Sequence, residues 1–132
     1  MTSFLVVDQE PKVCSAVSLL IENHPDWELL GVLQDPDQLT EVTRRRPPDI
    51  LILDRNLPNL GLTEFLEELE RDCPTTKVII LSNDQNRDRF ARSSIHGLIT
   101  KNSPPDRVIN QIEMIAGKHI TEHDKYERFT FD

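Results

Sequence analysis

Four short apolar runs in this chain each end at one polar residue that is able to take part in chemistry. In chain order, Phe4–Val7 ends at Asp8, Ile50–Leu53 at Asp54, Val78–Leu81 at Ser82 and Leu98–Thr100 at Lys101. Short runs with no polar face are typical of parallel strands that are buried on both sides of a sheet. Because open α/β sheets bind ligands at the carboxyl ends of their strands, the four polar groups are expected along one functional edge.

Helical patterns separate the apolar runs, so that strand and helix alternate five times. The patterns follow Pro11, Asp35-Pro36, Gly61, Asp84 and Ser103, the last ends at Gly117, and residues 27–33 form the second apolar run. This alternation with short connections predicts an α/β fold with a five-stranded parallel sheet, flavodoxin-like (βα)5 with strand order 2-1-3-4-5. The switch point of that order lies between the first and third strands, which end at Asp8 and Asp54.

The length of the chain predicts one domain with its own core. It has 132 residues, of which 37% are hydrophobic and 29% charged, and these values are ordinary for a globular protein. We expect the domain to span residues 1–118 and residues 119–132 to form a C-terminal tail or linker. No apolar run approaches the roughly 20 residues that cross a bilayer, and no signal peptide precedes the first strand. A cytoplasmic location is therefore expected.

Charge and cysteine content exclude several classes of function. The net charge of −8 argues against nucleic-acid binding, which needs clustered Lys and Arg. The one basic cluster, residues 44–46, lies at a predicted helix end, where cations complement the helix dipole. Cys14 and Cys73 lack CxxC spacing and are expected to be reduced thiols rather than metal ligands.

The predicted edge carries the groups needed for phosphoryl chemistry. A carboxylate such as Asp54 is able to attack phosphorus if Mg²⁺ and an ammonium neutralise the repulsion between the two anions. Asp8 and the backbone carbonyl of Asn56 are suitable oxygen ligands for Mg²⁺, Lys101 is a compact cation, and Ser82 is a hydroxyl donor. Each residue also has a structural explanation: Asp8 could cap the helix near Pro11, and an isolated Lys or Ser is usually only solvated.

Four segments in order carry a family likeness: Val6–Pro11, Leu53–Pro58, Ile80–Ser82 and Gly97–Lys101, with Lys101–Pro105 as an extension. Over roughly residues 3–117 the chain resembles the receiver domain of two-component response regulators, which has the CheY-like fold, and most of all the NarL/LuxR-type branch. The resemblance implies that a histidine kinase phosphorylates Asp54 and that Asp8, Asp54 and the Asn56 carbonyl hold Mg²⁺. It implies that Ser82 is the switch hydroxyl and Lys101 the phosphoryl-binding lysine.

The same resemblance implies a role in signal transduction and transcription regulation. The domain would be a switch, able at most to phosphorylate and dephosphorylate itself, rather than an enzyme. A DNA-binding output domain would lie outside this chain, and this domain would bind neither nucleic acid nor membrane. A homodimer through the last helix and the tail is left open.

Two residues depart from the family pattern. Gln9 stands where the family usually has a second acid, so one negative charge is missing, and Gln9 is at best an uncharged metal ligand. Weaker Mg²⁺ binding and slower phosphorylation are therefore expected. Leu98 stands at the position of the switch Tyr or Phe, so that no aromatic side chain can report phosphorylation there.

Three other hypotheses compete with the phosphoacceptor. A pseudo-receiver, which signals through protein contacts without phosphorylation, is favoured by Gln9 and Leu98 and opposed by Asp54, Ser82 and Lys101. A phosphatase of the haloacid dehalogenase type is disfavoured because Asn56 replaces its second Asp. A flavin carrier is disfavoured because residues 9–12 lack the Ser, Thr and Gly of a phosphate loop.

Overall fold

The computed structural model describes residues 1–83 and 95–117. Its elements are β1 (Thr2–Val7), α1 (Pro11–Glu22), β2 (Trp27–Leu33), a 3₁₀ turn (Pro36–Gln38), α2 (Leu39–Arg45), β3 (Ile50–Asp54), α3 (Leu62–Asp72), β4 (Lys77–Ser82), β5 (Gly97–Thr100) and α4 (Pro105–Ala116). The helix predicted after Asp84 and the predicted tail, residues 119–132, lie outside the described residues.

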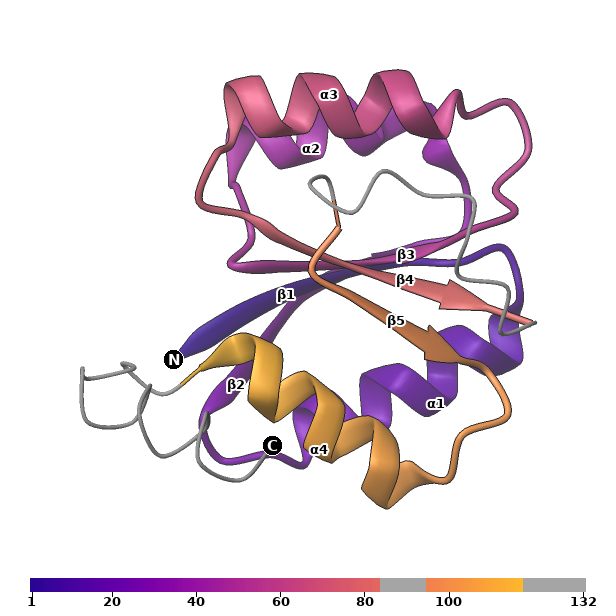
Figure 1. Cartoon of the computed structure of the whole chain (residues 1–132), viewed down its shortest axis with the longest axis vertical. Helices are drawn as coiled ribbons and strands as arrows, with labels where there is room; N and C mark the ends of the chain where they lie inside the picture. Colours follow the sequence, from indigo (N-terminus) through magenta and orange to yellow (C-terminus); the bar gives the residue numbers. More distant parts are fainter. Residues whose placement is uncertain (84–94, 118–132) are drawn as a thin grey trace, which may run out of the picture.

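The sheet confirms the predicted topology. Its five strands lie in the order β2-β1-β3-β4-β5, and all four neighbouring pairs are parallel. Helices α2 and α3 cover one face of the sheet, and α1 and α4 cover the other (Figure 1). The strand order therefore reverses between β1 and β3, and the carboxyl ends of these two strands lie side by side at the switch point.

Prolines and turn residues set the limits of the helices. Pro11 and Pro105 each occupy the first turn of a helix, where the missing N–H is not needed. Asp35 accepts a hydrogen bond from the Asp37 N–H at 2.8 Å, so it caps the 3₁₀ turn, and α2 begins only at Leu39. Gly117 ends α4 with a φ of 56°, a conformation that glycine adopts without steric cost.

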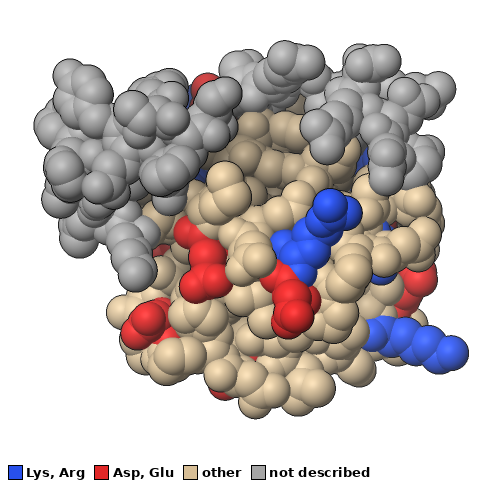
Figure 2. Space-filling view, turned by 60° about the horizontal axis from the view of Figure 1, so that its bottom comes forward, with Lys and Arg blue, Asp and Glu red and all other residues tan. Residues whose placement is uncertain are grey.

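The face formed by α1 and α4 carries few charges. Figure 2 shows this side of the molecule, where acidic and basic side chains are scattered among wide areas of other residues. Leu19 on α1 and Met114 on α4 are exposed apolar residues.

Within the described residues, no helix combines the length and apolarity that crossing a membrane would require.

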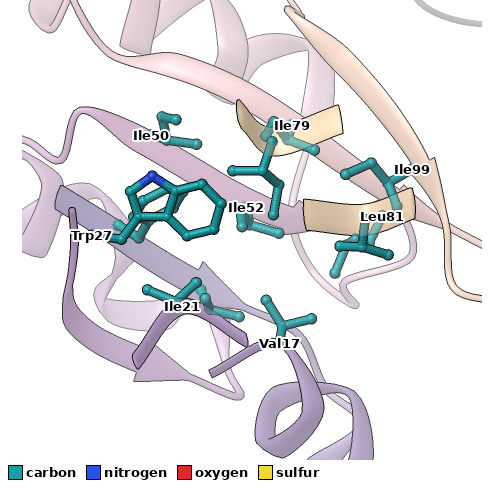
Figure 3. Packing of buried hydrophobic residues seen from close by; sticks show 12 residues of the cluster. Val17, Ile21, Trp27, Ile50, Ile52, Ile79, Leu81 and Ile99 are labelled. Carbon is teal, nitrogen blue, oxygen red and sulfur yellow. The ribbon is translucent and has the colours of Figure 1, made fainter. Parts of the chain in front are cut away.

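Alternate residues of each strand face opposite layers of the core. In β1, Phe4 and Val6 belong to the cluster beneath α1 and α4, whereas Leu5 and Val7 belong to the cluster beneath α2 and α3. Figure 3 shows the first cluster, in which Trp27 and side chains of α1 pack against the central strands. Both faces are apolar because helices cover both, which explains why the strands appear in the sequence as continuous apolar runs.

His96 joins the start of β5 to β4. The ring Nδ1 of His96 accepts the backbone N–H of Val78 at 3.0 Å, and the backbone N–H of His96 donates to the Val78 carbonyl at 2.7 Å. Partial burial and the positive charge of Lys77 lower the pKa of His96, against a smaller opposing effect of Glu70. The folded state therefore favours the neutral ring, which is the form able to accept this hydrogen bond.

We expect His96 to make the protein less stable in mild acid. Because its folded-state pKa lies below the unfolded value of 6.5, its contribution is lost as the pH falls through the folded-state value. Urea denaturation at pH values from neutral to mildly acidic should show a smaller decline for His96→Asn, whose amide oxygen accepts the same bond at any pH. Equal declines for the two proteins would contradict the prediction.

Candidate functional site

The polar residues that follow the strands lie at the carboxyl edge of the sheet, as predicted. Asp8 follows β1, Asp54 and Ser82 end β3 and β4, and Lys101 follows β5. The exposed fraction is 0% for both aspartates and 1% for Ser82. Backbone hydrogen bonds also join neighbouring strands at this edge: the N–H of Asp8 donates to the carbonyl of Leu33, and that of Lys101 donates to the carbonyl of Ser82. These bonds fix where each loop leaves the sheet.

The ammonium of Lys101 joins three carboxylates. Its Nζ lies 3.0 Å from Asp8 Oδ2, 3.2 Å from Asp54 Oδ1 and 2.9 Å from Glu10 Oε1. The Lys101 side chain is only 5% exposed, so these interactions lie in surroundings where charges act strongly. Three negative groups around one positive group leave an excess of negative charge, which favours a further cation.

Burial and charge shift the pKa values of two of these groups. Burial raises the pKa of Asp8, and the Asp54 charge adds to this effect, while the Glu10 N–H and Lys101 oppose it. Burial by itself would lower the pKa of Lys101, but the neighbouring carboxylates of Glu10, Asp8 and Asp54 outweigh burial and raise it. Lys101 is therefore a permanent cation in this site.

Local hydrogen bonds orient the two buried aspartates. Asp8 Oδ1 accepts the N–H of Glu10 at 2.8 Å, and Asp54 Oδ1 accepts the N–H of Asn56 at 3.1 Å. The N-cap of α1 is Glu10, so Asp8 is not the helix cap that its sequence position allowed. The Oδ2 atoms of both aspartates are buried and accept no hydrogen bond within the described part of the chain, although Lys101 lies close to that of Asp8. A buried carboxylate oxygen needs a cation or a donor, and Asp54 Oδ2 has neither among the described residues.

Gln9 contacts the backbone group that was predicted to bind the metal. Its Nε2 donates a hydrogen bond to the carbonyl oxygen of Asn56 at 3.1 Å. Neither this bond nor the Glu10–Lys101 ion pair was predicted from the sequence. The acidic character of Glu10 beside Asp8 was the available signal, but its partner is 91 residues away in the chain.

The donor atoms at this edge fit Mg²⁺, which prefers hard oxygen ligands and retains several waters. Asp8, Asp54 and the Asn56 carbonyl supply such oxygens, and Asp54 Oδ2 is buried without a hydrogen-bond partner among the described residues. In residues 1–83 and 95–117, no three His, Cys, Asp or Glu side chains form a group that could hold a metal by themselves. A cation here would therefore depend on the Asn56 carbonyl and on waters.

The remaining predicted positions have different surroundings. Ser82 pairs with Thr100 in the sheet register, next to Lys101. Leu98 is half-buried and packs against the apolar cluster beneath α2 and α3. The cysteines are free and buried, and Cys14 Sγ lies 3.1 Å from the Asp8 carbonyl oxygen. The homodimer stays a prediction.

Solved structures of similar fold include receiver domains of several response regulators. A LuxR-family DNA-binding response regulator from Staphylococcus aureus has a TM-score of 0.77 at 21% identity, covering 89% of this chain and 100% of that one. The response regulator domain of Thermotoga maritima CheB has a TM-score of 0.74 at 21% identity, covering 88% and 96%. At these identities the likeness shows the fold alone.

Curated relatives are longer than this chain. The transcriptional regulatory protein MctR of Rhizobium johnstonii is 26% identical over 86% of this chain and 54% of its own length. A protein-glutamate methylesterase/protein-glutamine glutaminase of Bordetella pertussis is 33% identical over 86% of this chain but only 34% of its own length. The chain thus spans about half or less of these relatives, so their named activities do not transfer to it.

The family comparison agrees with the observed fold. The family described as "Response regulator receiver domain" matches residues 4–113, from the middle of β1 to the last turns of α4. The chain belongs to the response regulator receiver domain family.

Proposed function

We propose that this chain is a phosphoacceptor receiver domain of a two-component phosphorelay and that a histidine kinase phosphorylates it on Asp54. One observation carries this proposal. Asp54 is fully buried at the switch point, its Oδ1 lies 3.2 Å from the Lys101 ammonium, and its Oδ2 has no hydrogen-bond partner among the described residues. A carboxylate oriented in this way is suited to accept an electrophile.

The chemistry follows from the positions of these side chains. A carboxylate oxygen of Asp54 forms a bond to phosphorus while the phosphorus–nitrogen bond of phosphohistidine breaks, and the imidazole nitrogen keeps the electron pair. Lys101 neutralises charge on the phosphoryl oxygens. Ser82, at the end of β4, is proposed to donate to another phosphoryl oxygen. Asp8 is proposed to bind the cation rather than to react.

Mg²⁺ is proposed as the cofactor, held by Asp8, Asp54 and the Asn56 carbonyl, and when bound it neutralises charge on the transferred group. The missing acid at Gln9 leaves this binding weak. We also propose that the domain, residues 1–118, belongs to the NarL/LuxR-type branch and acts in the cytoplasm. It would control a DNA-binding output domain outside this chain, and it would not itself be an enzyme.

Asp54→Asn is expected to abolish phosphorylation. Asn keeps the size of the side chain but lacks the nucleophilic oxygen, so no aspartyl phosphate forms. Wild type and variant are incubated with Mg²⁺ and acetyl phosphate, and intact-protein mass spectrometry counts the added phosphoryl groups. The wild type should gain one group, and Asp54→Asn should gain none.

A matched control uses Asp37, which lies on the exposed turn before α2. Asp37→Asn makes the same chemical change away from the site and should be labelled as the wild type is. Equal labelling of Asp54→Asn and wild type would place the phosphoryl group elsewhere. A wild type that stays unlabelled at saturating Mg²⁺ would reject the phosphoacceptor.

The pseudo-receiver is the second candidate. The observation in its favour is the Gln9–Asn56 hydrogen bond, which engages a proposed metal ligand. The ion pairs of Lys101 also stabilise the unphosphorylated site. The labelling experiment separates the two candidates, because only the phosphoacceptor gains a phosphoryl group on Asp54.

A further inference from the structure

We infer that Gln9 competes with the cation inside the same molecule. Its side-chain amide is hydrogen-bonded to the Asn56 carbonyl oxygen, and Mg²⁺ binds by displacing this amide. The inference deepens the proposed function and rests on it for the role of the site. It assigns to Gln9 an action beyond the loss of one negative charge.

The orientation of the Gln9 amide follows from the chemistry of its partner. The Asn56 carbonyl oxygen can only accept hydrogen bonds, so the amide group that lies 3.1 Å from it must be the NH₂ and not the oxygen. The amide therefore presents partial positive charge to the same oxygen that would coordinate a cation. An acid at this position would present negative charge to the cation.

The hydrogen bond weakens the carbonyl as a ligand. A carbonyl oxygen has two lone pairs, and the Gln9 amide uses one of them. A cation that approaches the same oxygen meets the positive end of the N–H dipole, so the two partners oppose each other. Mg²⁺ retains several waters and takes few protein ligands, so each protein ligand that it has matters for its affinity.

Glu10 does not compensate for Gln9 in this arrangement. Its carboxylate lies 2.9 Å from the Lys101 ammonium and is engaged there, while its backbone N–H donates to Asp8. In the loop after β1, Gln9 is thus hydrogen-bonded to the Asn56 carbonyl, and Glu10 forms an ion pair with Lys101. Both contacts stabilise the site without a metal.

The test separates competition by the amide from the missing charge. Isothermal calorimetry measures the Mg²⁺ affinity of wild type, Gln9→Ala and Gln9→Glu. Gln9→Ala removes the donor without adding charge, so the affinity should rise about two- to tenfold, the equivalent of one neutral hydrogen bond. Gln9→Glu should bind more tightly still. Gln34→Ala, at an exposed glutamine after β2, is the matched control and should bind as the wild type does.

A second measurement follows the amide directly. In nitrogen–proton correlation spectra of the wild type, the side-chain NH₂ signal of Gln9 should shift in step with Mg²⁺ saturation, because the hydrogen bond to Asn56 breaks. Unchanged or weaker Mg²⁺ binding by Gln9→Ala would overturn the inference. An NH₂ signal that stays fixed while Mg²⁺ saturates the site would also overturn it.

The result can be separated from that of the proposed function. If Asp54 is labelled but Gln9→Ala does not bind Mg²⁺ more tightly, the phosphoacceptor function stands and competition by Gln9 is rejected. A gain in affinity without labelling of Asp54 supports the competition and rejects the phosphoacceptor.

Discussion

Lys101→Met is expected to lower the free energy of unfolding by about 3–5 kcal/mol near neutral pH, the range for removing one partner of a buried ion pair. Met keeps the length of the side chain but removes its charge. Asp8 and Asp54, both 0% exposed, then face each other without the ammonium that lies within 3.2 Å of each. Urea denaturation followed by circular dichroism measures the loss.

The pH dependence of the Lys101 variant gives a second check. Lys101 has a raised pKa, so its contribution in the wild type is present below the unfolded value of 10.5 and is lost only as the pH rises through the folded-state value. Without Lys101, the pKa of Asp8, already raised by burial above 3.8, rises further. Near its raised pKa, Asp8 then binds more protons in the folded variant than in the unfolded chain. The variant should therefore regain stability as the pH falls toward the raised pKa of Asp8.

Two further variants isolate the electrostatic cause. Lys12→Met makes the same change on the exposed surface of α1 and should alter stability by no more than about 0.5 kcal/mol. The double variant Lys101→Met with Asp54→Asn removes one of the unpaired acids and should recover part of the loss. If Lys101→Met were as stable as Lys12→Met, the ammonium would not support the buried acids.

Phe4→Ala is expected to lower the free energy of unfolding by about 3–5 kcal/mol, as for other buried aromatic residues replaced by Ala. Phe4 is 0% exposed in β1, the strand between β2 and β3. Its ring centroid lies 5.1 Å from that of Trp27, so the substitution removes a ring contact as well as buried area. The helices packed on both faces of the sheet leave little room for the site to collapse.

Thermal and urea denaturation followed by circular dichroism measure this loss. Trp27 fluorescence is less suitable as a probe, because the Trp27 ring would lie beside the cavity that Phe4→Ala creates. Leu19→Ala on α1 is the control, since Leu19 is 60% exposed and its truncation should change stability by no more than about 0.5 kcal/mol. A loss below about 1 kcal/mol for Phe4→Ala would contradict the packing of this core.

The fold was predictable because its signals are local. Continuous apolar runs such as Ile50–Leu53 mark strands that are buried on both faces, and a proline at position 11 or 105 marks the first turn of a helix. Alternation with short connections leaves few topologies open, and the observed strand order is the predicted one. The start of α2 was less predictable, because Asp35 caps a 3₁₀ turn that precedes the helix.

The candidate site divides in the same way. The type of residue at each strand end is written in the sequence, and parallel strands bring these ends to one edge, so Asp8, Asp54 and Lys101 were predicted to lie together. The partners of Gln9 and Glu10 were not predictable. Their hydrogen bonds join residues 47 and 91 positions apart, and which loop side chain meets which group depends on distances that no local pattern encodes.

The sequence alone therefore determined the sheet, its order and the residue types at its functional edge, because backbone periodicity and chain connectivity control these features. Only the tertiary structure decided how the charges at that edge are distributed. It placed the Gln9 amide on the Asn56 carbonyl and the Lys101 ammonium among three acids. The physical reason is that hydrogen bonds and ion pairs act over a few ångströms through space, whatever the separation along the chain.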